Sequence, residues 1–543
     1  GNGIWSGLDD ESKAALNERI LSDLQDLVVR DNTTPEFRML EKKKIKQRQI
    51  RDQKEKQNAP QQKQTLNHLA KRCGDAAARV FHPTIKETAF QGMYSLPVID
   101  SLVETVGRVV AMPQSAALYD RKYEPQMAVF LVSGFVPSGG GVFREIKEIV
   151  YALLARNFEV LIVSTGKIET DESVIRTHFS DASISYFAND TGLAESEAIG
   201  AIQDILASAN ADRIYPFLTH HDVVGFAALQ KGFARRIIFD FVYDHGLSLG
   251  IHHSAIDTIV TKNNSQASAI AATVRPEKLV MLAPFLTDKS SGKEYVPRKN
   301  KRLTTATAAA RSYKIDTDYR HSYYDVILQI MKKLDVQHIH YGPLPDAGMS
   351  IISTQMKAEG LSDDQFVHIP WANDFGGSLV QQGVDVFIAP FPICSARIGV
   401  EVMSYGIPSI NHRALAPTLP EAGDFVSPGQ PCWNEPADLL ATLATLDEDK
   451  LAELSRETRQ FFLEQNEAGV SLEKFCKNAF DLPVINDTHP FQLSDLSTAS
   501  FTEIDAFSAF GVDALSRIKF WQRGPLRQKI RSKFHRAKTR FGL

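Results

Sequence analysis

The chain has 543 residues, of which 43% are hydrophobic and 23% charged, and its formal net charge at pH 7 is −4. Its length suggests about three domains of globular composition, and its charge argues against bulk binding of nucleic acid. The sequence contains no run of about 18 apolar residues, so we expect no transmembrane helix. The four cysteines form no CxxC pair, so we expect no zinc motif and a reducing, cytoplasmic location.

The first 122 residues are predicted to form an all-helical region. Residues 8–30 place apolar side chains on one helical face, at Leu16, Ile20, Leu24 and Leu27. Residues 41–64 are rich in Lys, Arg and Gln, which indicates a solvated charge run in an exposed helix or a linker. Residues 65–120 have a helical pattern again. We therefore expect no chemistry from this region.

The pattern changes at Met127 to that of a βαβ unit. The segments AVFLVSGFV and FEVLIVST predict buried strands, and REIKEIVYALLARN between them predicts an amphipathic helix. Gly139, Gly140 and Gly141 follow the first strand and let the backbone approach a ligand, so we predict an acceptor or phosphate loop there. The spacing is not G-x-G-x-x-G, and a tight turn without a ligand is the alternative.

Two clusters of polar residues fall at the ends of later strands in this first lobe. DRIYPFL is followed by His220, His221 and Asp222, and RRIIFDFV leads to His245. A histidine beside an aspartate can act as a general base with an orienting carboxylate, and we prefer His221 with Asp222 over His245 for that role. The alternative is that Asp222 caps a helix beside two surface histidines.

A second α/β lobe begins after a polar connection at residues 287–312. Its predicted elements are the helix YYDVILQIMKKL, the strand VQHIHYG, the helix GMSIISTQMKAEG and the strand FVHIPWA. The predicted domains are residues 1–122 (helical region), 123–290 (first lobe), 291–482 (second lobe) and 483–543 (C-terminal extension).

The segment from Asp385 to His412 carries the clearest site of the second lobe. Asp385–Ala389 predicts a buried strand, Ser395 can cap a helix that runs to about Tyr405, and Gly406 and Pro408 end that helix. Ligands of α/β sheets bind where strands end and helices begin, and the N–H groups of a helix start suit a phosphate. Glu401 lies about two turns further on, within reach of the sugar of a nucleotide. An ordinary strand–helix unit with a surface glutamate is the alternative.

The C-terminal segment from Arg523 to Arg540 contains eight Lys and Arg residues and no acidic residue. Leu526, Ile530 and Phe534 repeat every four residues, which predicts a basic amphipathic helix. Such a helix can lie on an anionic membrane surface, so peripheral attachment at the inner face of the membrane is one interpretation. A helix that packs on the protein itself is the other.

The segment PFPICSARIGVEVMSYGIP resembles the signature of O-GlcNAc transferase and the bacterial cytoplasmic N-glycosyltransferases. These are GT-B enzymes, with two Rossmann-like lobes and a cleft between them. The resemblance implies that the helix start binds the donor pyrophosphate and that the acid binds the ribose. It assigns these roles to Ser395, Ala396, Arg397, Ile398 and Glu401. The threonines of the family are absent here, and Arg397 stands among their positions, where it can pair with the diphosphate directly.

Two weaker matches extend the resemblance. Tyr313-Lys314-Ile315 is similar to the Lys-Ile segment of the family, which implies that Lys314 binds the donor phosphates and stabilises the leaving group. By position, Trp371 and Ala372 would flank the nucleotide base. The segment YDHGLSLGIHHSAID, residues 243–257, is similar to a His/Gly/Ser loop of the family.

The mechanism implied by these matches is inverting and independent of metal, with a nucleotide sugar, expected to be a UDP-sugar, as substrate and no cofactor. EVMSYGIPSI also resembles retaining GT-B enzymes, but those carry a second acid eight residues earlier, where this chain has Ile393. The acceptor is expected to be a protein side chain or a surface polysaccharide. A retaining polysaccharide transferase, a GT-B-like nucleotide-sugar epimerase and a non-catalytic partner subunit are the alternatives.

Overall fold

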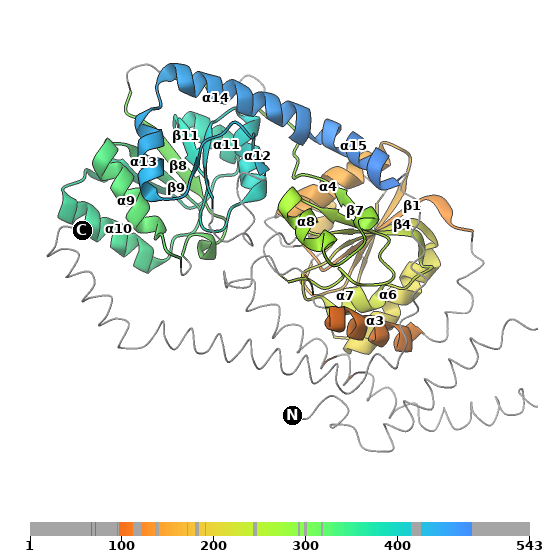
Figure 1. The fold of residues 1–543 in the computed structure, drawn as a ribbon. Coiled ribbons are helices and arrows are strands. Elements are labelled where there is room, and N and C mark those ends of the chain that lie inside the picture. Colours follow the sequence, from red (N-terminus) through yellow and green to blue (C-terminus); the bar gives the residue numbers. More distant parts are fainter. Residues whose placement is uncertain are drawn as a thin grey trace, which may run out of the picture.

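The computed structural model describes two α/β lobes, shown in Figure 1. The described residues are 97–111, 122–135, 141–170, 172–179, 184–189, 192–242, 247–290, 294–297, 301–316, 319–413 and 425–480, together with Asn67, Lys71 and Ser95. We call the lobe that begins at residue 122 the N lobe and the lobe that begins at residue 301 the C lobe. The two-lobe α/β architecture predicted from the sequence is confirmed.

The N lobe contains a seven-stranded sheet in the order β3-β2-β1-β4-β5-β6-β7, with every neighbouring pair parallel. Its strands are β1 (Glu124–Val132), β2 (Glu159–Ser164), β3 (Ile184–Ala188), β4 (Ala211–Phe217), β5 (Ala234–Asp240), β6 (Thr258–Thr261) and β7 (Leu279–Met281). Every residue of β4 is buried, as expected for a parallel strand covered by helices on both faces. The order reverses between β1 and β4, which makes their carboxyl ends a topological switch point.

The helices of the N lobe are α4 (Gly141–Leu154), α5 (Glu172–His178), α6 (Glu195–Ala209), α7 (Val223–Ala228) and α8 (Asn264–Ala271). Helix α3 (Pro97–Ala111) precedes the lobe in sequence and lies beside α6 and α7 (Figure 1). Ile99, Leu102, Val103 and Val106 of α3 are buried in the same hydrophobic core as strands β1 and β4. Helix α3 is thus packed as part of the N lobe, although the sequence assigned it to a separate helical region.

The C lobe contains a six-stranded sheet in the order β10-β9-β8-β11-β12-β13, again with parallel neighbours. Its strands are β8 (Thr304–Ala308), β9 (Gln337–Tyr341), β10 (Phe366–Ile369), β11 (Val386–Ile388), β12 (Ser409–His412) and β13 (Cys432–Trp433). Its helices are α9 (Tyr323–Leu334), α10 (Asp346–Glu359), α11 (Phe375–Gln381), α12 (Ala396–Ser404), α13 (Pro436–Ala444) and α14 (Glu448–Phe461). The switch point of this sheet lies between β8 and β11.

The last described helix returns to the N lobe. A short π-helix (Phe462–Asn466) follows α14, and α15 (Ala468–Phe480) then lies over the N lobe (Figure 1). Ala468, Leu472 and Phe475 of α15 are buried in the N-lobe core. The sequence placed this helix in the second lobe, because helical periodicity shows that one face is buried without showing which lobe buries it.

Candidate functional site

Helix α12 begins at the switch point of the C-lobe sheet, as the sequence predicted. It spans Ala396–Ser404, with Ser395 as the N-cap residue and Tyr405 as the C-cap. The side chain of Ser395 makes no capping hydrogen bond, and its buried hydroxyl has no partner among the described residues. Ser395 therefore stands at the predicted N-cap position, but the predicted capping hydrogen bond of its side chain is not formed. The first N–H groups of α12 have no side-chain cap, which leaves them available to an anion.

Lys314 lies directly beside this helix start. It ends a short 3₁₀ turn (Ser312–Lys314) after β8, and its ammonium donates a hydrogen bond of 2.6 Å to the carbonyl oxygen of Cys394. The carbonyl of Lys314 in turn accepts a 3.3 Å hydrogen bond from Ile393 N–H. Two segments that lie 80 residues apart in sequence thus place the positive charge of Lys314 beside the positive end of the α12 dipole. This arrangement suits a phosphate group.

Arg397 and Glu401 lie one turn apart on α12 and face the first turns of α4 in the N lobe. A Cβ atom placed on Gly141 would lie 3.4 Å from Cδ of Arg397. One turn further along α4, Nη1 of Arg144 lies 3.7 Å from Oε2 of Glu401. Burial lowers the pKa of the Arg397 guanidinium, and the nearby Glu145 carboxylate opposes that shift. The two lobes therefore meet through charged side chains at the two helix starts.

The loop between β10 and α11 lies against the same helix. Oε1 of Glu401 accepts a hydrogen bond of 3.4 Å from Gly376 N–H, and the hydroxyl of Tyr405 donates one of 3.0 Å to Asp374. Trp371 on this loop is 64% exposed, and its indole N–H donates a hydrogen bond of 2.8 Å to nearby Asn373. Ala372 packs against the C-lobe core. The start of α11, which follows the loop predicted to flank a base, thus adjoins the glutamate predicted to bind a ribose.

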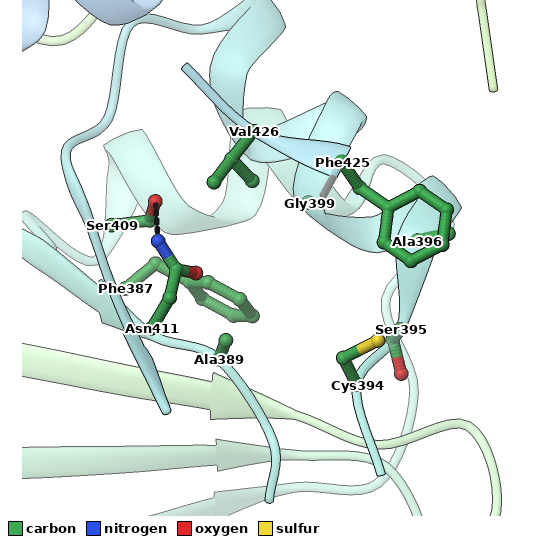
Figure 2. A pocket seen from close by; sticks show the side chains of 10 residues that line it. All are labelled: Phe387, Ala389, Cys394, Ser395, Ala396, Gly399, Ser409, Asn411, Phe425 and Val426. Carbon is green, nitrogen blue, oxygen red and sulfur yellow. Dashed lines mark hydrogen bonds between the residues drawn. The ribbon is translucent and has the colours of Figure 1, made fainter. Parts of the chain in front are cut away.

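A small cavity lies between the start of α12 and the carboxyl ends of β11 and β12 (Figure 2). Cys394, Ser395 and Ala396 line it from the helix start, and Ala389 and Asn411 line it from the strand ends. Its volume is about 10 Å³, which is close to the lower limit for a single water molecule. The cavity is therefore part of the packing behind the helix start and is too small for a nucleotide.

The N-lobe histidines lie at the other switch point, directly after β4. Nδ1 of His221 is 3.1 Å from Nε2 of His220. His220 is buried and His221 is partly exposed, so the two are not the pair of surface histidines in the alternative interpretation.

Asp222 does not orient His221 through any of the hydrogen bonds observed for its carboxylate. The carboxylate is fully buried and caps α7 by accepting a 3.0 Å hydrogen bond from Gly225 N–H. Its second oxygen accepts hydrogen bonds from the hydroxyls of Ser133, at 2.5 Å, and Thr165, at 2.7 Å. Because three donors, one directly after β1, one directly after β2 and one in α7, already occupy the carboxylate, its observed role is to tie these elements together. The capping interpretation is the one that fits.

Three charged residues missed in the sequence analysis lie beneath the start of α4. The Lys262 ammonium is buried between the carboxylates of Glu145 on α4 and Asp240 at the end of β5. Burial raises the pKa of Asp240 to about 7, although the charge of Lys262 opposes the rise. The sequence signal was available, because Asp240 is the last residue of β5 and Lys262 directly follows β6, the next strand.

Several predicted features lie outside the described residues: Gly139, Gly140, His245 and the basic C-terminal segment 523–540. Gly141, the last of the three glycines, is described, and it lies at the start of α4 opposite Arg397. Within the part of the chain that the structure describes, no helix is both long enough and apolar enough to cross a membrane.

No protein-family model and no curated protein matches this sequence. Among solved structures, a glycosyltransferase from Rickettsia africae aligns with a TM-score of 0.51 and 12% identity over 66% of this chain and 100% of that chain. A variant of O-GlcNAc transferase from Thermobaculum terrenum aligns with a TM-score of 0.49 and 13% identity, over 82% of this chain and 81% of that chain. HepE from Anabaena, in complex with UDP and glucose, aligns with a TM-score of 0.47 and 14% identity, over 66% of this chain and 100% of that chain.

The two parallel sheets and the match to the Rickettsia africae structure define the fold as GT-B, the architecture of nucleotide-sugar glycosyltransferases. This confirms the fold that the sequence resemblance implied. At these identities the comparisons establish the fold alone, and the roles of individual residues rest on the geometry described above.

Proposed function

We propose that this protein is a glycosyltransferase that moves a sugar from a nucleoside-diphosphate sugar, expected to be a UDP-sugar, to an acceptor. The observation that carries the proposal is the position of the Lys314 ammonium at the switch point of the C-lobe sheet. It hydrogen-bonds to the carbonyl of Cys394, the residue directly before Ser395 at the uncapped start of α12. The GT-B fold supports it, because the Rickettsia africae protein of the same fold is a glycosyltransferase.

The donor diphosphate would bind at the start of α12. The N–H groups of Ala396, Arg397 and Ile398 can donate to its oxygens, and the side chains of Lys314 and Arg397 can neutralise its charge. These cations stabilise the diphosphate most when it departs with an additional negative charge, so they lower the barrier to transfer. Because protein cations can supply this neutralisation, we expect activity in the presence of EDTA.

The nucleoside would occupy the C-lobe side of the interlobe boundary. The carboxylate of Glu401 can accept hydrogen bonds from the ribose hydroxyls, and it is only 18% exposed, where such bonds are stronger than in water. The exposed indole of Trp371 and the adjacent Ala372 lie on the loop that contacts the same helix, where a base can stack.

Transfer would proceed with inversion at the anomeric carbon. An acceptor oxygen or nitrogen forms the new bond to that carbon while the bond to the diphosphate oxygen breaks, and the electron pair of that bond leaves with the diphosphate. The acceptor proton would pass to the imidazole of His221, which acts as general base. Ile393 is fully buried and apolar where the retaining enzymes carry an acid, so that position offers no carboxylate to the sugar.

The acceptor is proposed to be a protein side chain or a growing surface polysaccharide. The basic segment 523–540 would bring the enzyme to an anionic membrane surface. Removal of residues 523–543 should then abolish binding to anionic liposomes at low salt and preserve turnover of a soluble acceptor. If the intact protein does not bind those liposomes, the membrane proposal is wrong.

A thermal-shift screen with UDP-, GDP-, CMP- and dTDP-sugars tests the function, because a bound donor raises the apparent Tm. We expect a UDP-sugar to raise the Tm of the wild type and to leave the Tm of Lys314→Ala unchanged. Product analysis by NMR then separates the alternatives. Inverted configuration supports the proposed mechanism, and retained configuration contradicts it. Conversion of the donor without an acceptor would indicate an epimerase, and binding without turnover would indicate a partner subunit.

A further inference from the structure

The segment 247–256, between β5 and β6, contacts the histidine pair through the backbone. Leu249 N–H donates a hydrogen bond of 3.0 Å to the carbonyl oxygen of His220. The segment then turns at Gly250, whose φ of +100° is in the region that favours glycine. A Cβ atom on Gly250 would lie 2.3 Å from the ring of Phe226 on α7. The turn is therefore fixed closely against the helix that begins beside His221.

Helix α3 holds the same turn with two carboxylates. Asp100 accepts hydrogen bonds from Gly250 N–H, at 2.7 Å, and from His252 N–H, at 2.8 Å. One helical turn later, Glu104 accepts a 3.1 Å hydrogen bond from Ser254 N–H and another from the Ser254 hydroxyl. Both carboxylates are buried, at 2% and 7% exposure, so their acceptors are directed at this turn rather than at water.

Helix α3 can act as a fixed support because it is closely packed against α7. A Cβ atom on Gly107 would lie only 1.8 Å from the carbonyl oxygen of Ala227, so the two backbones are in direct contact. The side-chain amide of Gln203 donates to both carbonyl oxygens, at 2.9 Å to Gly107 and 3.3 Å to Ala227. Movement of α3 would therefore move the turn and α7 together.

A buried carboxylate that only anchored a helix would find its partners in any nearby element. These two bond to backbone N–H groups of the segment that hydrogen-bonds to the His220 carbonyl, and Glu104 also lies 3.6 Å from the guanidinium of Arg108 on its own helix. The desolvation of Asp100 raises its pKa to about 7, so this arrangement is costly to hold in the ionised form. A group kept at such a cost is a candidate for a role beyond packing.

We propose that Asp100 and Glu104 are positioning residues for the acceptor-side histidines: they fix the 247–256 turn, which fixes the His220 carbonyl and hence the imidazole of His221. The inference rests on the proposed function, in which His221 is the general base.

The test compares three variants of the full chain. Asp100→Asn keeps the size of the side chain but offers only one acceptor oxygen to two backbone donors. Glu104→Gln does the same for Ser254. Thr105→Val is the matched control, because Thr105 is also buried on α3 but its hydroxyl bonds within the helix, to the carbonyl of Ser101 at 2.8 Å. The measurements are kcat, donor Kd by calorimetry, and hydrogen–deuterium exchange of peptides covering 247–256 and 219–223.

We expect Asp100→Asn to lower kcat by about tenfold, to leave donor Kd within twofold of wild type, and to speed exchange in both peptides; a tenfold change corresponds to about 1.4 kcal/mol. Thr105→Val should change none of these. If Asp100→Asn does not fold at the assay temperature, Glu104→Gln carries the same test.

The inference and the function it rests on fail separately. If His221→Ala loses activity while Asp100→Asn and Glu104→Gln keep full kcat and normal exchange, the positioning role is wrong and the function stands. If His221→Ala keeps full activity, the general base is wrong. Faster exchange confined to 247–256, with 219–223 unchanged, would show that the turn does not reach the histidines, and it would overturn the inference.

Discussion

The carboxyl edge of the C-lobe sheet presents cations and an uncapped helix start, whereas the same edge of the N-lobe sheet presents two adjacent histidines followed by a buried aspartate. Lys314 and Arg397 represent the first edge, and His220 with His221 represents the second. The first arrangement attracts an anion, and the second can position a base that accepts a proton. The division matches what a transfer from a diphosphate donor requires of its two sides.

The largest effect is expected on the cationic edge. Lys314→Ala should lower kcat by about 100- to 1000-fold, the usual range for loss of one group that stabilises developing negative charge. Lys332→Ala is the control, because Lys332 is an exposed lysine of the same lobe that pairs with Glu359. Steady-state kinetics with a saturating donor measures the effect. An equal loss of activity in both variants would show that the charge of Lys314 has no special role.

The N-lobe edge should separate chemistry from folding. His221→Ala should lose at least ~100-fold in kcat, the low end for a general base, with little change in Tm. Asp222→Ala should mainly lower stability, because it leaves Gly225 N–H and two hydroxyls without their acceptor, and loss of a helix cap alone costs about 0.5–2 kcal/mol. Denaturation and kinetics on both variants measure the two effects. If Asp222→Ala keeps its Tm and loses activity, the aspartate acts on His221 after all.

The two edges also differ in how much of them the sequence could reveal. The C-lobe edge lies largely within one continuous segment, and the strand, the helix start and Glu401 follow from its local pattern of apolar residues, prolines and glycine. Lys314 needed a family resemblance, since 80 residues separate it from Cys394. The position of the helix was predictable, but the absence of a Ser395 cap was not, because a capping bond depends on the rotamer that packing allows.

The N-lobe edge is assembled from separate parts of the chain, and the sequence revealed less of it. The pattern HHD gave the correct strand end but two interpretations of Asp222, and only the hydroxyls of Ser133 and Thr165 decide between them. The contact of Asp100 with Gly250 spans 150 residues, and no periodicity predicts it. Helical patterns located α3 and α15 without showing what they pack against, since amphipathicity identifies a buried face and not its partner.

Donor affinity tests the C-lobe edge independently of turnover. Glu401→Ala should weaken UDP-sugar binding by roughly 10- to 150-fold, because a hydrogen bond to a charged group contributes about 1.5–3 kcal/mol. Isothermal titration calorimetry measures it, with Glu453→Ala on the exposed face of α14 as the control. An unchanged Kd in Glu401→Ala would remove the ribose assignment.

Burial of the Asp100 carboxylate on α3 should make the stability of the N lobe depend on pH. The pKa of Asp100 is raised from 3.8 to about 7 by desolvation, so between those values the folded protein holds a proton that the unfolded chain has lost. Stability should therefore fall as pH rises through this window and stay reduced above it. Other titratable or charged groups lie nearby and also contribute to the pH dependence of stability: Glu104, His252, His253, Arg108 and Lys278. Between pH 5.5 and pH 8, we expect the Tm of Asp100→Asn to fall by several degrees less than the Tm of the wild type. An equal fall in both proteins would contradict the assignment.

The smallest effect is expected where the two edges touch. Arg144 of α4 reaches across to Glu401, and the same carboxylate is proposed to bind the ribose, so the donor and Arg144 compete for it. Arg144 is 51% exposed, and a pair of that kind is worth about 0.2–1 kcal/mol. Arg144→Ala should therefore tighten donor binding by no more than about fivefold, and high salt should reduce the difference between variant and wild type. Lys147→Ala, one turn further along α4 and over the ring of Tyr151, is the control. Weaker donor binding in Arg144→Ala would mean that the arginine contacts the donor itself, and the N-lobe edge would then contribute a cation to the site as well as a base.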